Sequence, residues 1–212
     1  MKLPRGTRLA VTDYLRLHYS EEETAELLRK TAAYYRAFVL EAPAPGGLNF
    51  FRSQYYGGLS VFAFYEAMAG NVAQEDLQKI LWRMLLNGGE IETKRPFRFP
   101  FSGTRLQAAA YAVLRKYVGF MNRQADRGRW KNIWKAAVNP QGRKNGISMP
   151  LMSCPVAAFA KRHGYEHLMP MFCGSDFKVA ERFGLRLIRE HTEAEGFPDC
   201  DFWYLRESDP PE

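Results

Sequence analysis

The spacing of apolar residues changes near Gly128, and this change constrains the fold more than any other feature of the sequence. Before it, apolar residues recur every three or four positions over long segments, as in amphipathic helices. After it, the segments are short and are interrupted by Gly, Pro and Asn, as in short strands and helices joined by turns. We therefore expect an α+β fold: an N-terminal helical bundle-like half packed with a small antiparallel sheet and short helices at the C-terminal end.

The length of 212 residues suits one domain that buries a core without cross-links. We expect a single domain over residues 1–212, mainly helical over 1–127 and α+β over 128–206, with a disordered tail over 207–212. The start has no signal-like apolar run, and no stretch approaches the roughly twenty apolar residues of a membrane span. The three cysteines form no CxxC pair, which favours free thiols. These features predict a cytoplasmic protein with no membrane partner.

Several helices can be predicted in the N-terminal half. Ser20 and Glu23 form a capping-box pattern ahead of an apolar repeat, which predicts a helix over Glu21–Glu41. Further helices are expected over residues 57–69 and 73–86, and from Ser102 or Thr104 to about residue 124. The stretch 96–101 alternates in polarity but holds two prolines, so we expect a loop or an edge segment there.

The C-terminal half predicts two short helices and two strand pairs. Pro155 suits the first turn of a helix that Gly164 ends, and a second short helix is expected over residues 175–183. Residues 134–138 and 147–152 are expected to pair as strands. Residues 186–193 and 200–206 are expected to form an antiparallel pair across the turn 195–199.

Two cysteines and one carboxylate stand near the expected helix starts. Cys154 and Cys173 each precede an expected short helix, and a helix N-terminus lowers the pKa of a thiol. Asp176 follows Cys173 by three residues and has two open roles, a general base or a helix-cap acceptor. The spacing alone favours the cap.

The period of two in the expected strand 186–193 places Arg189 and His191 on one face. An arginine can bind a substrate carboxylate at two points, and a histidine can transfer protons near neutral pH. The alternative is an ion-paired surface strand, in which Arg189 bonds to Glu190 or Asp199 and His191 is only solvated. The spacing alone favours this alternative.

The charge pattern and the possible metal ligands add little to a functional interpretation. Residues 94–144 hold thirteen Lys and Arg against the single acid Asp126, although the whole chain carries only +7. Such a segment could attract nucleic acid, an anionic membrane or a small anionic substrate, but no nucleic-acid motif accompanies it. We therefore interpret it as a solvated helix face and do not expect a nucleic-acid partner. The Cys and His spacings disfavour zinc, so we expect no metal and no cofactor.

Four motifs in order resemble a known family. LMPMFCGSD at residues 168–176, RLIREHTEAEG at 186–196 and CDFWY at 200–204 resemble the C-terminal signature of the L-2-amino-thiazoline-4-carboxylic acid hydrolase family. Upstream, SCPVAAFAKRHG at 153–164 is similar to the Cys-Pro helix of that family. Together these motifs take in all three cysteines.

The resemblance implies hydrolytic opening of a cyclic amidine, the ring of 2-aminothiazoline-4-carboxylate, to a carbamoyl-cysteine. The expected partner is thus a small anionic, amino-acid-like substrate. In this interpretation Cys173 is the nucleophile or a thiol that lines the site, and Asp176 is the general base. Arg189 binds the carboxylate and His191 donates a proton. The remaining expected pocket residues are Thr192, Cys200, Asp201 and Cys154. The alternative is a non-catalytic domain that binds or senses a small molecule. The oligomeric state is not predicted.

Overall fold

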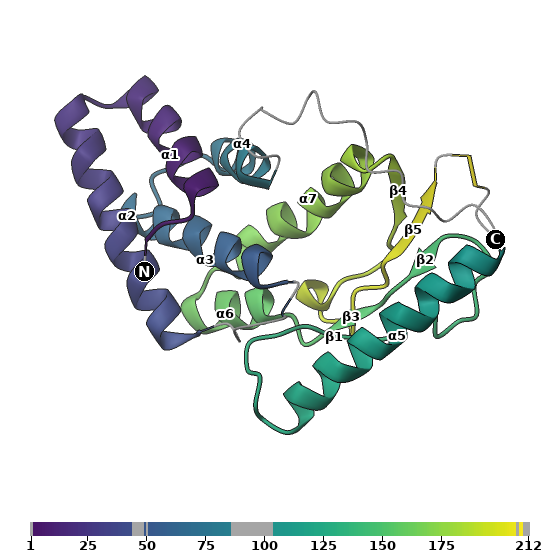
Figure 1. Ribbon diagram of the computed structural model, residues 1–212. Helices are drawn as coiled ribbons and strands as arrows, with labels where there is room; N and C mark the ends of the chain where they lie inside the picture. The colour runs from purple at the N-terminus through teal and green to yellow at the C-terminus, as the bar shows by residue number, and fades with distance from the viewer. Residues whose placement is uncertain (1, 44–48, 50, 86–103, 207, 210–212) are drawn as a thin grey trace. The chain divides into compact units, whose positions relative to one another are not determined.

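The structure is a computed structural model that describes residues 2–43, 49, 51–85, 104–206 and 208–209. Along the chain, the longest helices come first and the described strands follow, so the expected α+β fold is confirmed (Figure 1). The expected loop or edge segment over residues 96–101 lies outside the described residues, and so does the last residue of the helix expected over 73–86. Among the residues described, no helix is long and apolar enough to span a membrane.

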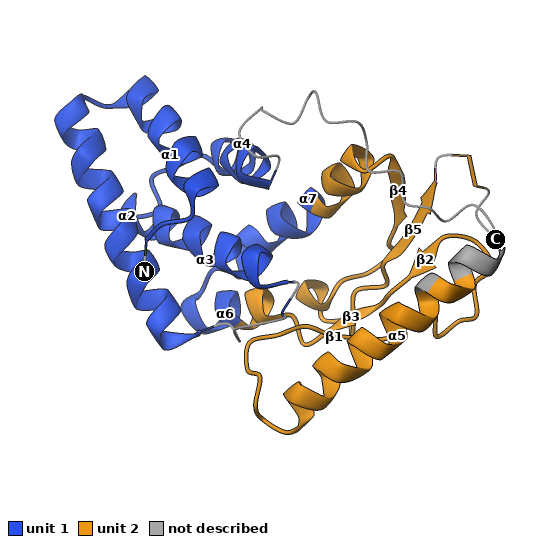
Figure 2. Ribbon diagram, in the orientation of Figure 1, with its two compact units in different colours: residues 1–94, 159–175 blue, residues 95–158, 176–212 orange. Residues whose placement is uncertain are grey.

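The chain forms two compact units, which Figure 2 distinguishes by colour. Unit 1 comprises Met1–Lys94 and Phe159–Ser175, and unit 2 comprises Arg95–Ala158 and Asp176–Glu212. Both units are therefore built from two separate stretches of sequence. The expectation of one domain with boundaries at 127 and 206 stays a prediction.

Unit 1 contains the helices α1 (Arg5–His18), α2 (Glu21–Glu41), α3 (Arg52–Ala67) and α4 (Gln74–Leu85). The helix expected over Glu21–Glu41 is confirmed. Its capping box is complete, because the Glu23 N–H donates to Ser20 Oγ at 3.3 Å and the Ser20 N–H donates to Glu23 Oε2 at 2.9 Å. The predicted start of α3 was five residues too late, since Gly57 lies inside the helix.

The core of unit 1 is aromatic. Phe62 of α3 is fully buried and stacks on Phe159 and Tyr165, with ring centroids 5.8 Å and 5.1 Å apart. Phe38 of α2 meets Phe159 edge-to-face at 5.0 Å. Offset and edge-to-face ring pairs stabilise a core beyond the area that they bury. The stretch 159–175 thus completes a core that begins in the first hundred residues.

The helix α6 (Pro155–His163) confirms the prediction from Pro155, and Gly164 ends it with φ 74°. The next helix was predicted to start too late. Helix α7 spans Met169–Arg182, so it starts six residues before the predicted position and contains Gly174 in its interior. Cys173 therefore does not precede a helix but lies within its second turn.

Unit 2 contains the long helix α5 (Thr104–Asp126) and two small antiparallel sheets. In the first, β1 (Lys135–Ala136) pairs with β3 (Leu151–Met152). In the second, the order is β2 (Ile147–Ser148), β5 (Trp203–Arg206), β4 (Leu185–Ile188), with β5 in the middle.

The two predicted strand pairs were right in partnership and wrong in length. The expected strand 147–152 divides into two, and only its second half pairs with β1, since the first half pairs with β5. The pair of β4 and β5 is confirmed, with Leu187 opposite Tyr204. However, β4 ends at Ile188, so Arg189 and His191 lie beyond the strand on which they were expected.

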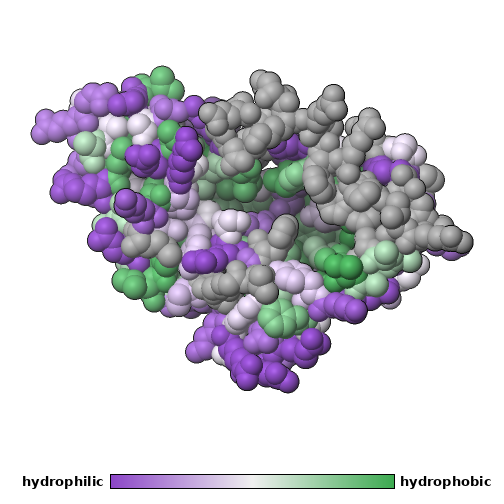
Figure 3. All heavy atoms as spheres, in the orientation of Figure 1, coloured by the Kyte–Doolittle hydropathy of each residue, from purple (hydrophilic) through white to green (hydrophobic). Residues whose placement is uncertain are grey.

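Most of the described basic side chains of the segment 94–144 are exposed, although Arg143 is partly buried over the ring of Trp203. Hydrophilic side chains gather at the end of α5 and on the turn that follows it (Figure 3), where Arg127, Arg129 and Lys131 are exposed. Asp126 accepts a bond from Lys135 at 2.6 Å. These charges lie in water, as a solvated helix face requires.

Candidate active site

Asp176 and Arg189 form an ion pair in unit 2. Asp176 lies in α7 and Arg189 directly after β4, and Arg189 Nη1 donates to Asp176 Oδ2 at 2.9 Å. The two side chains are only 19% and 7% exposed. The guanidinium also lies over the rings of Phe177 and Phe202, at 4.9 Å and 5.3 Å from their centroids. One carboxylate and two aromatic rings thus fix the position of the Arg189 charge.

The position of Asp176 in α7 excludes one of the two roles considered for this residue, the helix cap. Because α7 begins at Met169, Asp176 is in the interior of the helix and is not a cap, so the interpretation favoured by spacing was wrong. Burial raises the pKa of the Asp176 carboxyl to about 6, and the charge and hydrogen bond of Arg189 oppose this only in part. A carboxylate with such a pKa can accept a proton near neutral pH.

The partner of Arg189 also differs from both acids suggested for a surface strand, since it is neither Glu190 nor Asp199. A guanidinium carries five N–H donors. In the described residues only one of those on Arg189 has a hydrogen-bond acceptor, Asp176. The other N–H donors of Arg189 have no hydrogen-bond acceptor among the described residues.

His191 is held between two other carboxylates. Its Nε2 lies 2.8 Å from Asp199 Oδ1, its Nδ1 lies 3.5 Å from Asp201 Oδ1, and its ring stacks on Phe197 at 4.7 Å. The hydrogen bond to Asp199 raises the pKa of His191, and the neighbouring charges of Asp201 and Glu190 add to this. His191 is therefore not merely solvated, as the surface-strand alternative supposed.

Asp201 also explains why the strand stops. Its carboxylate accepts the backbone N–H of Glu190 at 3.1 Å and that of His191 at 2.9 Å. These two N–H groups are thereby satisfied by a side chain in place of a neighbouring strand. Asp201 thus shapes the loop that carries His191.

Glu193 connects two of the cysteines, and the sequence analysis gave it no role. Its Oε2 accepts the Cys154 N–H at 2.7 Å, and its own N–H donates to Cys200 Sγ at 3.3 Å. Cys200 is buried and bonds through its backbone to Leu151 in both directions. The position of Glu193 in the motif RLIREHTEAEG was the only available signal.

The other expected pocket residues are placed as follows. Cys154 precedes α6, and its sulfur accepts the Ala157 N–H at 3.4 Å. Thr192 is buried and donates to Glu195 at 2.8 Å. Cys173 lies three residues before Asp176 in α7, a spacing that puts two side chains on one side of a helix. Cys173 belongs to unit 1, however, whereas the other predicted site residues belong to unit 2.

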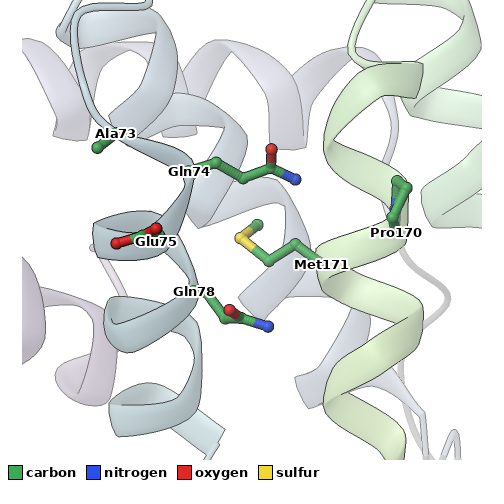
Figure 4. A pocket seen from close by; sticks show the side chains of 6 residues that line it. All are labelled: Ala73, Gln74, Glu75, Gln78, Pro170 and Met171. Carbon is green, nitrogen blue, oxygen red and sulfur yellow. The ribbon is translucent and has the colours of Figure 1, made fainter.

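An open hollow of about 460 Å³ lies in unit 1 between the starts of α4 and α7. Gln74 and Gln78 point from α4 toward Met171 of α7 (Figure 4). None of the predicted site residues lines it. In the part of the chain that the structure describes, no group of three or more His, Cys, Asp or Glu side chains is arranged to hold a metal ion.

Comparison with known proteins extends the family resemblance beyond the short motifs. The sequence model of the L-2-amino-thiazoline-4-carboxylic acid hydrolase family matches residues 52–204, which includes α3 to α7 and every predicted site residue. No curated protein and no solved structure matches the chain. Since the matched stretch is well over half of the 212 residues, the chain belongs to the L-2-amino-thiazoline-4-carboxylic acid hydrolase family.

Proposed function

We propose that this protein is a hydrolase that opens a cyclic amidine, such as 2-aminothiazoline-4-carboxylate, to a carbamoyl-cysteine. Membership of the family supports a hydrolase. The observation that carries the proposal is the enclosed pair of Asp176 and Arg189, a proton acceptor and a cation 2.9 Å apart. The reaction needs both, because water must be activated and the substrate carboxylate must be held.

Asp176 is the general base in this proposal. Water adds to the ring carbon that bears nitrogen and sulfur, and it becomes nucleophilic as it loses a proton. A base is most effective when its pKa lies near the working pH, and the pKa of Asp176 is about 6. Asp176 is thus ionised at neutral pH and still basic enough to accept the proton.

Arg189 holds the substrate carboxylate. Two of its remaining N–H donors can grip a carboxylate at two points, while the bond to Asp176 keeps the base beside the substrate. A lysine could not do this, because it lacks the planar fork of donors. Arg189 and Asp176 therefore act together, because one binds the substrate carboxylate while the other activates the water.

The other predicted residues take supporting roles. His191 supplies a proton to the atom that leaves the ring carbon, since its raised pKa keeps more of it protonated at neutral pH. Cys173 is the nucleophile or a thiol that lines the site. The pocket residues are proposed to be Thr192, Cys200, Asp201 and Cys154.

A non-catalytic binding or sensing domain is the second candidate. The hollow in unit 1 favours it, because two glutamines and a methionine line this hollow and no proposed catalytic residue does. Such a domain would bind the thiazoline carboxylate without consuming it.

The deciding experiment is incubation of the purified protein with 2-aminothiazoline-4-carboxylate while new thiol and carbamoyl product are followed. Asp176→Asn should lower turnover by about 100-fold or more, because loss of a general base costs roughly that much. The matched control is Asp209→Asn, since Asp209 also pairs with an arginine, Arg206, at 2.6 Å. The control should retain wild-type turnover.

Thermal unfolding must accompany the assay, because the Asp176→Asn substitution leaves the charge of Arg189 without a counter-charge. The amide oxygen of the new asparagine can still accept the Arg189 N–H, so a folded variant is expected. Binding without product formation by the wild-type protein would favour the sensing domain. Full turnover by folded Asp176→Asn and Cys173→Ala variants would remove the catalytic assignment.

A further inference from the structure

Tyr204 lies on the same face of the sheet as the ion pair. In β5, side chains alternate, so Tyr204 shares a face with the preceding Phe202, whereas Trp203 points to the other face. The rings of Phe202 and Tyr204 stack at 5.8 Å, and Phe202 lies under the Arg189 guanidinium at 5.3 Å. Because β5 is the central strand, it is hydrogen-bonded to β2 on one side and to β4 on the other, and these bonds fix the backbone of Tyr204.

The hydroxyl of Tyr204 has no hydrogen-bond partner among the residues that the structure describes. The side chain is partly buried. Burial raises the pKa of this phenol, the charge of Asp176 raises it further, and Arg189 opposes the shift. The hydroxyl therefore lies within the field of both members of the ion pair and stays protonated at any working pH.

The Tyr204 hydroxyl is only partly buried, so it is accessible to a small molecule that binds beside the ion pair. A bound acceptor there would form a hydrogen bond that the protein itself does not supply. Two tyrosines that are more deeply buried have protein partners: Tyr165 donates to Glu66 at 2.7 Å and Tyr111 to the Gly146 carbonyl at 2.7 Å. A bound substrate beside Asp176 and Arg189 would provide the missing acceptor for Tyr204.

We propose that Tyr204 is a further catalytic residue, whose hydroxyl donates a hydrogen bond to the ring nitrogen of the cyclic amidine during the addition of water. This inference rests on the proposed function and adds a residue to the same site. Neither Asp176, as a carboxylate, nor Arg189, as the carboxylate clamp, can fill this role.

The electron balance of the step explains why a donor is needed. When water adds, a C–O bond forms and the π pair of the C=N bond moves onto the ring nitrogen. Asp176 takes the water proton and then passes it to that nitrogen, so protons balance. Tyr204 keeps its own proton and stabilises the negative charge that develops on the nitrogen before the transfer is complete.

Tyr204→Phe tests this role, because it removes only the hydroxyl. Loss of one donor of this kind typically lowers kcat by about 100-fold to 1000-fold, and KM should change little because the donor acts mainly in the transition state. The melting temperature should not fall, since the described structure gives the hydroxyl no bond to lose.

Tyr111→Phe is the matched control in the same unit. Its hydroxyl bonds to the Gly146 carbonyl and accepts the Ser148 N–H at 3.3 Å, so its removal should lower the melting temperature and leave kcat unchanged. A Tyr204→Phe variant with wild-type kcat, in a protein that Asp176→Asn inactivates, would overturn the role of Tyr204 alone. A wild-type protein that opens no cyclic amidine would overturn the proposed function and this role together.

Discussion

Unit 2 contains two Asp–Arg pairs in which the pKa of the aspartate is shifted in opposite directions. Asp209 accepts bonds from Arg206 on both carboxylate oxygens, and these bonds hold the pKa of Asp209 below its usual value. Asp176 accepts one bond from Arg189, and the loss of water around it outweighs this bond and raises its pKa. Asp209 accepts several hydrogen bonds and keeps a low pKa, as a structural carboxylate does. Asp176 accepts one bond and is more strongly desolvated, so its raised pKa suits proton transfer.

This difference predicts the pH dependence of the reaction. The base must be ionised, so kcat/KM should fall as the pH is lowered through about 6, the pKa of Asp176, with a limiting slope near tenfold per pH unit. Initial rates from about pH 4.5 to 8 at low substrate concentration measure it. Asp209→Asn should keep the same acid limb. Values of kcat/KM that stay constant down to about pH 4.5, as expected for a base with the ordinary aspartate pKa of about 3.9, would contradict the role of Asp176.

The motif in the sequence suggested candidate site residues, but it could not predict how their side chains pair. The motif identified Asp176, Arg189 and His191, whereas strand periodicity placed Arg189 and His191 on one continuous strand. The backbone leaves the strand at Ile188 because Asp201 accepts two N–H groups of the next residues. Such a side-chain acceptor depends on tertiary contacts, which a local pattern does not contain.

Among the elements, the helices with a chemical signal at their start were located best, whereas α3, which lacks a side-chain cap, was predicted to start too late and α1 was missed. The capping box at Ser20 located α2, and Pro155 located α6. Helix α1 follows Pro4 with no side-chain cap and no acid in its first turn, so it gave no comparable signal. Helix α7 was predicted to start late because Gly174 and Ser175 are typical of turns, although packing keeps them helical.

The pairing of β2 with β5 depends on a glycine at position 146. Gly146 has φ 67°, and a Cβ there would lie 2.2 Å from the Tyr204 carbonyl oxygen and 2.7 Å from Leu205 Cδ2. The first contact is with backbone and cannot be relieved by a rotamer change. Gly146→Ala should therefore destabilise the protein by about 2 kcal/mol beyond the cost of placing an alanine at a positive φ. Urea unfolding measures the difference.

Gly142→Ala is the matched control, because Gly142 has φ 69° in the same loop but no atom within 4 Å of the position that an added Cβ would take. It should cost only the left-handed backbone penalty, roughly 1 kcal/mol. Urea unfolding curves with equal midpoints and slopes for the two variants would show that the close contact between residue 146 and β5 does not affect stability. Because Tyr204 lies on β5, Gly146→Ala should also lower turnover.

At the scale of the whole molecule, the family signature is divided between the two units. Cys173 belongs to the later stretch of unit 1, and Asp176 begins the last stretch of unit 2, although both lie in α7. The sequence predicted a boundary where helices give way to strands, near Gly128. The two compact units follow packing contacts between distant segments, which hydrophobic periodicity does not contain, because it reports faces and not partners.

This division predicts that residues 1–94 cannot fold alone. In the whole chain Phe62 is completely buried, and two of its ring partners, Phe159 and Tyr165, come from the later stretch. Loss of one large core aromatic costs about 3–5 kcal/mol, so loss of two approaches the entire stability of about 5–15 kcal/mol of a typical domain. The fragment should lack a cooperative thermal transition in circular dichroism and should give poorly dispersed amide NMR signals. Adding a peptide of residues 155–176 should restore both in part, whereas the same peptide with Phe159→Ala and Tyr165→Ala should not. A cooperative transition in the fragment alone would mean that the later stretch is not part of the core of unit 1.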